Sequence, residues 1–96
     1  MVSRKVVAGD REMLAQSYLK RGALIPLHRH ESEQMTYVLQ GALRFLVAGD
    51  EITVREGEVL HISPAVDHQA EALEDTLALD VFSPIRTAWP EDRDGT

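Results

Sequence analysis

Short runs of hydrophobic residues recur along the chain, separated by Gly, Pro or Asp at intervals of roughly ten residues, which is typical of a β-sandwich or barrel. The alternation is clearest at Leu43, Phe45 and Val47, because side chains two positions apart share one face of a strand. The pattern predicts strands over residues 5–8, 13–20, 23–28, 34–39, 43–47, 52–54, 59–62, 68–72 and 76–82. A helix over residues 10–16, capped by Asp10, is the alternative there.

The periodic pattern ends near the C-terminus. After Pro84 no alternation of hydrophobic and polar residues remains. We therefore expect a single domain over residues 1–96, with a core over about residues 4–86 and a flexible tail over residues 87–96. Within that tail, Trp89 is expected to make a dimer or edge contact.

Composition narrows the class of partner. The chain has 96 residues, 44% of them hydrophobic, and a formal charge of −6, which argues against nucleic acid or a membrane surface as partner. A small anionic substrate is compatible, because one divalent metal and one arginine reverse the local field. No signal peptide or run of about 20 apolar residues is present, so we expect a cytoplasmic protein. A homodimer is expected, with Val6 and Val7 on an edge strand that needs cover.

Histidines suggest a metal site. His28 and His30 lie two positions apart and so share one face of a strand, and the polar amide of Gln34 follows. This looks like half of a metal pocket, and His68 is the candidate for the other half. Because the chain has no cysteine, only nitrogen and oxygen ligands are available, and three histidines suit Ni, Zn, Fe or Mn while leaving open positions. The alternatives are exposed histidines near a strand end and a hydrogen-bonding role for Gln34.

Two motifs in the sequence resemble those of the cupin family. The resemblance covers roughly residues 22–82 and rests on the following positions: Gly22, His28, His30, residue 34 and Gly41, then Gly57, Pro64 and His68. It implies an all-β double-stranded β-helix, a jelly-roll barrel with one divalent metal ion in its mouth. It also implies the metal ligands His28, His30, Gln34 and His68. Gln34 stands where Glu is usual in cupins, and a neutral ligand favours a Lewis-acid role over oxidation.

A narrower resemblance concerns residues 35–41 and 80–86. These segments resemble the small pectin-degradation cupins of the KdgF type, which convert 4,5-unsaturated uronates to open-chain keto sugars. The resemblance implies that Asp80, Phe82 and Arg86 handle the substrate. Asp80 would transfer protons, Arg86 would bind the uronate carboxylate, and Phe82 would form an apolar wall. The sequence Glu31-Ser32-Glu33 departs from the expected pattern at the pocket rim.

Plainer interpretations remain open beside these. Asp80 could be only an ion-pair partner of Arg86, Phe82 could be plain core, and His61 is expected to be a core or pocket-wall histidine. A metal-dependent dioxygenase or oxidase is the alternative activity, and a ligand-binding cupin without activity is a third. Histidine must be neutral to bind a metal, so we expect metal loss as the pH falls below about 6.

Overall fold

Strands make up all the regular structure of the described residues. The computed structural model describes residues 1–86 and 89, in which no helix is long and apolar enough to cross a membrane. The strands are β1 (Val2–Ala8), β2 (Met13–Leu19), β3 (Leu24–His28), β4 (Glu33–Gln40), β5 (Ala42–Val47), β6 (Asp50–Arg55), β7 (Val59–Ile62), β8 (His68–Ala72) and β9 (Thr76–Ser83).

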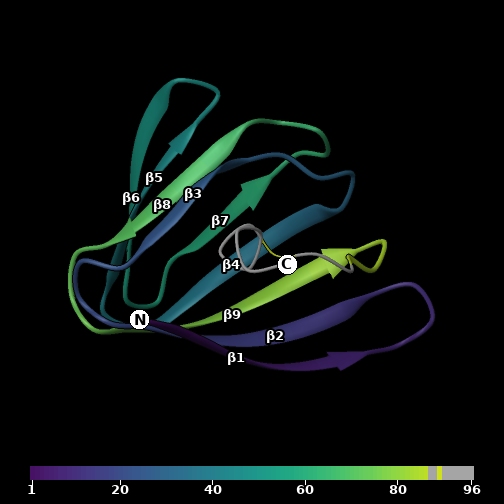
Figure 1. The fold of residues 1–96 in the computed structure, drawn as a ribbon, viewed down its shortest axis with the longest axis horizontal. Helices are drawn as coiled ribbons and strands as arrows, with labels where there is room; N and C mark the ends of the chain where they lie inside the picture. The colour runs from purple at the N-terminus through teal and green to yellow at the C-terminus, as the bar shows by residue number, and fades with distance from the viewer. Residues whose placement is uncertain (87–88, 90–96) are drawn as a thin grey trace.

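The strands form two antiparallel sheets (Figure 1). One sheet has the order β1-β2-β9-β4-β7, and the other has the order β3-β8-β5-β6. Apart from the consecutive pairs β1–β2 and β5–β6, neighbouring strands are distant in sequence, as in a jelly roll, and the two inner faces pack against each other. The prediction of an all-β jelly-roll fold is confirmed.

Local patterns explain where the strands lie. β2 alternates buried and exposed residues along its whole length, so the helix considered for residues 10–16 is wrong. β1 begins at Val2, earlier than the predicted edge strand over residues 5–8, because its whole length pairs with β2. Gly41, at φ +94°, joins β4 to β5 where a Cβ atom would lie 2.5 Å from the carbonyl oxygen of Asp75. Only glycine fits this close approach.

The core between the sheets consists mainly of aliphatic and alanine side chains. Its largest cluster is made of Leu19, Ala23, Val38, Leu43, Phe45, Val54, Ile62, Ala70, Ala72 and Ala78. A smaller cluster of Met13, Ala15 and Phe82 lies beside it and packs against Ile85 and Trp89. The Phe82 ring also reaches His30, with 5.7 Å between ring centroids. The smaller cluster therefore adjoins the predicted metal site.

Candidate metal centre

The fold brings the three predicted histidine ligands together. His28 ends β3 and lies directly opposite His68 in β8, with their ring centroids 4.2 Å apart. His30 follows two residues later, and its ring centroid lies 4.9 Å from that of His68. One ligand atom from each of the three rings falls within 4.8 Å of the others, close enough to hold a metal ion.

Backbone carbonyls set the orientation of each imidazole. In all three rings Nδ1 lies 2.8 Å from a carbonyl oxygen two residues away, at Pro26 for His28, Ser32 for His30 and Val66 for His68. A carbonyl only accepts hydrogen bonds, so each Nδ1 must carry the proton. Each Nε2 therefore presents a lone pair, which is the arrangement found in metal-binding histidines.

Burial keeps the imidazoles neutral. Desolvation lowers the pKa of His28 to about 4, and the positive charge of Arg86 acts in the same direction, as protonation of His68 or His30 would. Desolvation also lowers the pKa of His30 and of His68, with Arg86 contributing in both cases. Neutral imidazole is the form that binds a metal, so the site favours the ligand form at neutral pH.

Gln34 approaches from the opposite sheet, where it is buried in β4. Its Oε1 lies 3.1 Å from Nε2 of His30, and its Nε2 lies 2.9 Å from the Thr36 hydroxyl. That hydroxyl donates its single proton to Asp80 over 2.6 Å, so it must accept from the amide NH₂. The hydrogen-bond chain thus turns the Gln34 carbonyl oxygen toward the histidines.

This set of donors fits a divalent cation. Nε2 of His68 is buried and has no hydrogen-bond partner among the described residues. Nε2 of His30 and Oε1 of Gln34 are both acceptors, so their contact is favourable only when a cation lies near them. Imidazole nitrogens and a carbonyl oxygen could hold a divalent transition metal, and being neutral they would leave its charge uncompensated.

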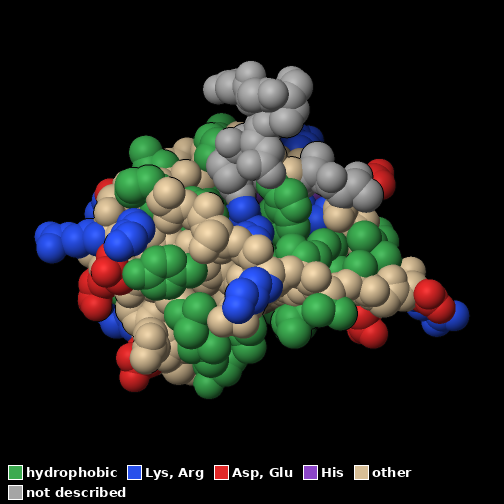
Figure 2. Space-filling view, turned by 60° about the horizontal axis from the view of Figure 1, so that its bottom comes forward, with side chains coloured by type: hydrophobic (Ala, Val, Ile, Leu, Met, Phe, Trp, Pro, Cys, Tyr) green, Lys and Arg blue, Asp and Glu red, His purple; other side chains and the backbone are tan. Residues whose placement is uncertain are grey.

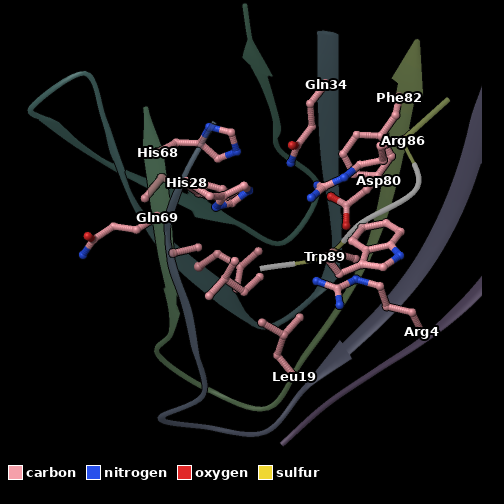
Figure 3. Close-up of a pocket in the computed structure, with 15 residues that line it drawn as sticks. Arg4, Leu19, His28, Gln34, His68, Gln69, Asp80, Phe82, Arg86 and Trp89 are labelled. Atoms are coloured by element: carbon pink, nitrogen blue, oxygen red, sulfur yellow. The ribbon is translucent and has the colours of Figure 1, made fainter. Parts of the chain in front are cut away.

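A cavity extends from the histidines toward the end of β9. Together with the open solvent at its mouth, it takes in about 440 Å³. Figure 3 shows His28 and His68 on one wall and Gln34, Asp80 and Phe82 on the facing wall. Asp80 and Phe82 are both buried on the inner face of β9, and Arg86 follows the strand into the same cavity.

The charges of Asp80 and Arg86 are both affected by burial. Desolvation raises the pKa of Asp80, opposed by hydrogen bonds from the Thr36 and Ser17 hydroxyls. Desolvation lowers the pKa of Arg86 to about 10; the charge of Arg4 acts in the same direction and that of Asp80 opposes it. Arg86 therefore stays charged at neutral pH, close enough to Asp80 for the two charges to interact.

The structure corrects one expectation, places Trp89 and adds one residue. His61 is not a core or pocket-wall histidine, because it points out of the sheet and pairs with Glu33 on the surface. Trp89 is half-buried over Phe82 and lines the cavity. Arg4 also lines the cavity, which the sequence pattern had not predicted. Its place between Val2 and Val6, on the inward face of β1, was the available signal.

A two-sheet jelly roll with three histidines at one end defines a cupin-like metal site. The sequence matches the Cupin domain family over residues 16–83, so the chain belongs to this family. A search of curated proteins gave no match.

Solved structures agree with this assignment. The fold is similar to KdgF from a Halomonas species, with a TM-score of 0.84 and 33% identity over 88% of this chain and 80% of that one. It is also similar to an RmlC-like cupin from Shewanella frigidimarina, with a TM-score of 0.84 and 25% identity over 99% and 81% of the two chains. A mutant of oxalate decarboxylase OxdC from Bacillus subtilis shares the fold only, with a TM-score of 0.78 and 23% identity over 88% and 26%.

Proposed function

We propose that the protein is a cytoplasmic, metal-dependent enzyme that opens the ring of 4,5-unsaturated uronates to give keto sugars without redox change. The observation that carries the proposal is the cavity that His28 and His68 share with Asp80 and Arg86, next to the third histidine of the cluster, His30. The sequence resemblance to KdgF-type cupins and the similarity to the Halomonas KdgF structure support it.

The proposed reaction is an isomerisation, in which one proton is removed from the sugar and one is added to it. The anomeric hydroxyl loses its proton, C1 becomes a carbonyl, and the bond from C1 to the ring oxygen breaks. The electron pair left on that oxygen forms an enolate, and protonation at C4 yields the ketone. One proton is removed and one is returned, so a single buried carboxyl group can serve as base and then as acid.

The residues of the cavity match these needs. Burial raises the pKa of Asp80, so this carboxyl group takes up a proton more readily than an ordinary aspartate does. The Arg86 guanidinium would bind the uronate carboxylate, and Phe82 would limit water in the cavity. A divalent metal held by His28, His30, His68 and Gln34 would supply Lewis-acid polarisation of substrate oxygens.

Activity is tested directly on a 4,5-unsaturated monouronate. Protein loaded with Zn, Ni, Fe or Mn in turn is incubated with the substrate, and loss of the enol-ether absorbance is followed. We expect the loss to be faster than the spontaneous rate with at least one metal. A rate equal to the spontaneous one with all four metals would overturn the proposal, and oxygen uptake would instead indicate an oxidase.

We also propose that the protein is a homodimer. Exposed apolar residues form a row across the outer face of the five-stranded sheet, from Val7 in β1 through Leu14 and Val81 to Met35 in β4. Figure 2 shows hydrophobic side chains gathered in patches on the β1–β2 side of the molecule. We expect light scattering to give twice the chain mass, and Val81→Glu to lower it. A monomer mass at all concentrations would contradict the dimer.

A further inference from the structure

Positive charge gathers in the cavity although the chain is acidic. The formal charge of the protein is −6, yet Arg4 and Arg86 both line the cavity, and a divalent metal would add to them. Among the described residues that line it, Asp80 is the only acidic one, and burial raises its pKa. This local field favours an anionic ligand.

Trp89 holds both arginines in place. The guanidinium carbon of Arg4 and that of Arg86 each lie 4.3 Å from the centre of a Trp89 ring, and the carbon of Arg86 lies 5.0 Å from the centre of Phe82. Figure 3 shows the two arginine side chains approaching Trp89 from β1 and from the segment after β9. Stacking on an aromatic face restrains the orientation of a guanidinium.

The two arginines meet at one side chain, because the guanidinium carbons of both lie 4.3 Å from a Trp89 ring. The charge of Arg4 lowers the pKa of Arg86, and the charge of Asp80 opposes it. A ligand carboxylate would add a second negative charge beside the two guanidinium groups, and each guanidinium can pair with a carboxylate. Arg4 reaches this position because it faces inward in β1, opposite the buried Ser17 of β2.

We propose that Arg4 and Arg86 together bind one carboxylate of the substrate, with Trp89 as the platform that aligns them. The idea rests on the proposed function in one respect, that the carboxylate belongs to a uronate. Arg4 is then a determinant of specificity that selects acidic sugars over neutral ones.

Binding can be measured apart from turnover. Trp89 is the only tryptophan of the chain, so its fluorescence reports on the subsite. The zinc-loaded full chain is titrated with D-galacturonate, a saturated uronate that the proposed reaction does not consume, and with neutral D-galactose. The midpoint of the titration is compared for the wild type, Arg4→Gln and Lys5→Gln. Lys5 is the matched control, because it carries the same charge on the same strand but is exposed.

We expect Arg4→Gln to weaken galacturonate binding about tenfold or more, as loss of a charge-assisted hydrogen bond does, and Lys5→Gln to change it less than about twofold. Galactose should bind weakly to every variant. An unchanged galacturonate midpoint in Arg4→Gln would overturn the proposal. If that variant does not fold, Arg4→Lys decides, since it keeps the charge but loses the paired donors; wild-type affinity in it would also overturn the proposal.

Two further measurements test which ligand the arginines bind and whether it reacts. Inorganic phosphate tests which type of oxyanion the arginines prefer. If phosphate binds more tightly than galacturonate, and its binding depends on Arg4, the assignment to a carboxylate is overturned. Turnover of the unsaturated uronate tests the proposed function separately. Arg4-dependent galacturonate binding without turnover would support the subsite and refute the enzyme. Turnover of the unsaturated uronate, combined with uronate binding that does not depend on Arg4, would support the enzyme and refute the subsite.

Discussion

Removing the Thr36 hydroxyl should weaken both the fold and the metal site. Thr36→Val keeps the shape of this buried side chain but leaves the amide of Gln34 and the carboxylate of Asp80 without their shared partner. A hydrogen bond to a charged group contributes about 2 kcal/mol and a neutral one about 1 kcal/mol, so the free energy of unfolding should fall by about 3 kcal/mol. The Gln34 amide also becomes free to turn its oxygen away, which should lower metal affinity about tenfold.

Two assays separate these effects. Urea unfolding of the metal-free protein, followed by Trp89 fluorescence, gives the loss of stability, and zinc competition against a chelating dye gives the affinity. Thr53→Val is the matched control, since Thr53 lies in β6, away from the histidines. A Thr36→Val variant that loses stability yet binds zinc as tightly as the wild type would refute the role of Thr36 in orienting Gln34.

The ionisable groups of the cavity set the response to pH and the rate of proton transfer. Because burial lowers the pKa of His28 to about 4, zinc affinity should stay level from pH 7 to about 5 and weaken below pH 5. An ordinary histidine, with a pKa of about 6.5, would lose zinc at a higher pH. A tenfold loss of zinc affinity by pH 6 would contradict this prediction. Unfolded histidines take up protons below about pH 6.5 while the folded ones do not, so urea unfolding should show metal-free protein losing stability as the pH falls from 6.5 toward 4. Asp80→Asn should slow loss of the enol-ether absorbance about 100-fold or more with zinc still bound, and a wild-type rate would exclude Asp80 as the proton-transfer group.

Periodicity predicted the sheet scaffold, and the spacing of the histidines together with the resemblance to cupins predicted that they converge. His28 ends β3 and His30 lies two residues beyond the strand, so the two rings do not share a strand face as predicted, yet both meet His68, which the resemblance to cupins had placed opposite them. The inward direction of Asp80 and Phe82 followed from their parity in the last strand. The strands and the direction of side chains within them depend on the local alternation of hydrophobic and polar residues, which can be seen in the sequence.

Features set by tertiary contacts could not be predicted in this way. The orientation of Gln34 depends on Thr36 and Asp80, which pair across β4 and β9. Arg4 enters the cavity because β1 pairs at the edge of the five-stranded sheet. The periodicity of a sequence does not predict the order of its strands. His61 sits in an apolar run, but its strand turns that side chain outward toward Glu33.

The metal centre is tested most directly by a crystal structure of the zinc-loaded protein with anomalous scattering recorded at the zinc edge. We predict one anomalous peak per chain, coordinated by Nε2 of His28, His30 and His68 and by Oε1 of Gln34. A chain without a peak between these side chains, or with its zinc bound at His61 and Glu33 on the outer face, would contradict the metal centre from which the proposed chemistry follows.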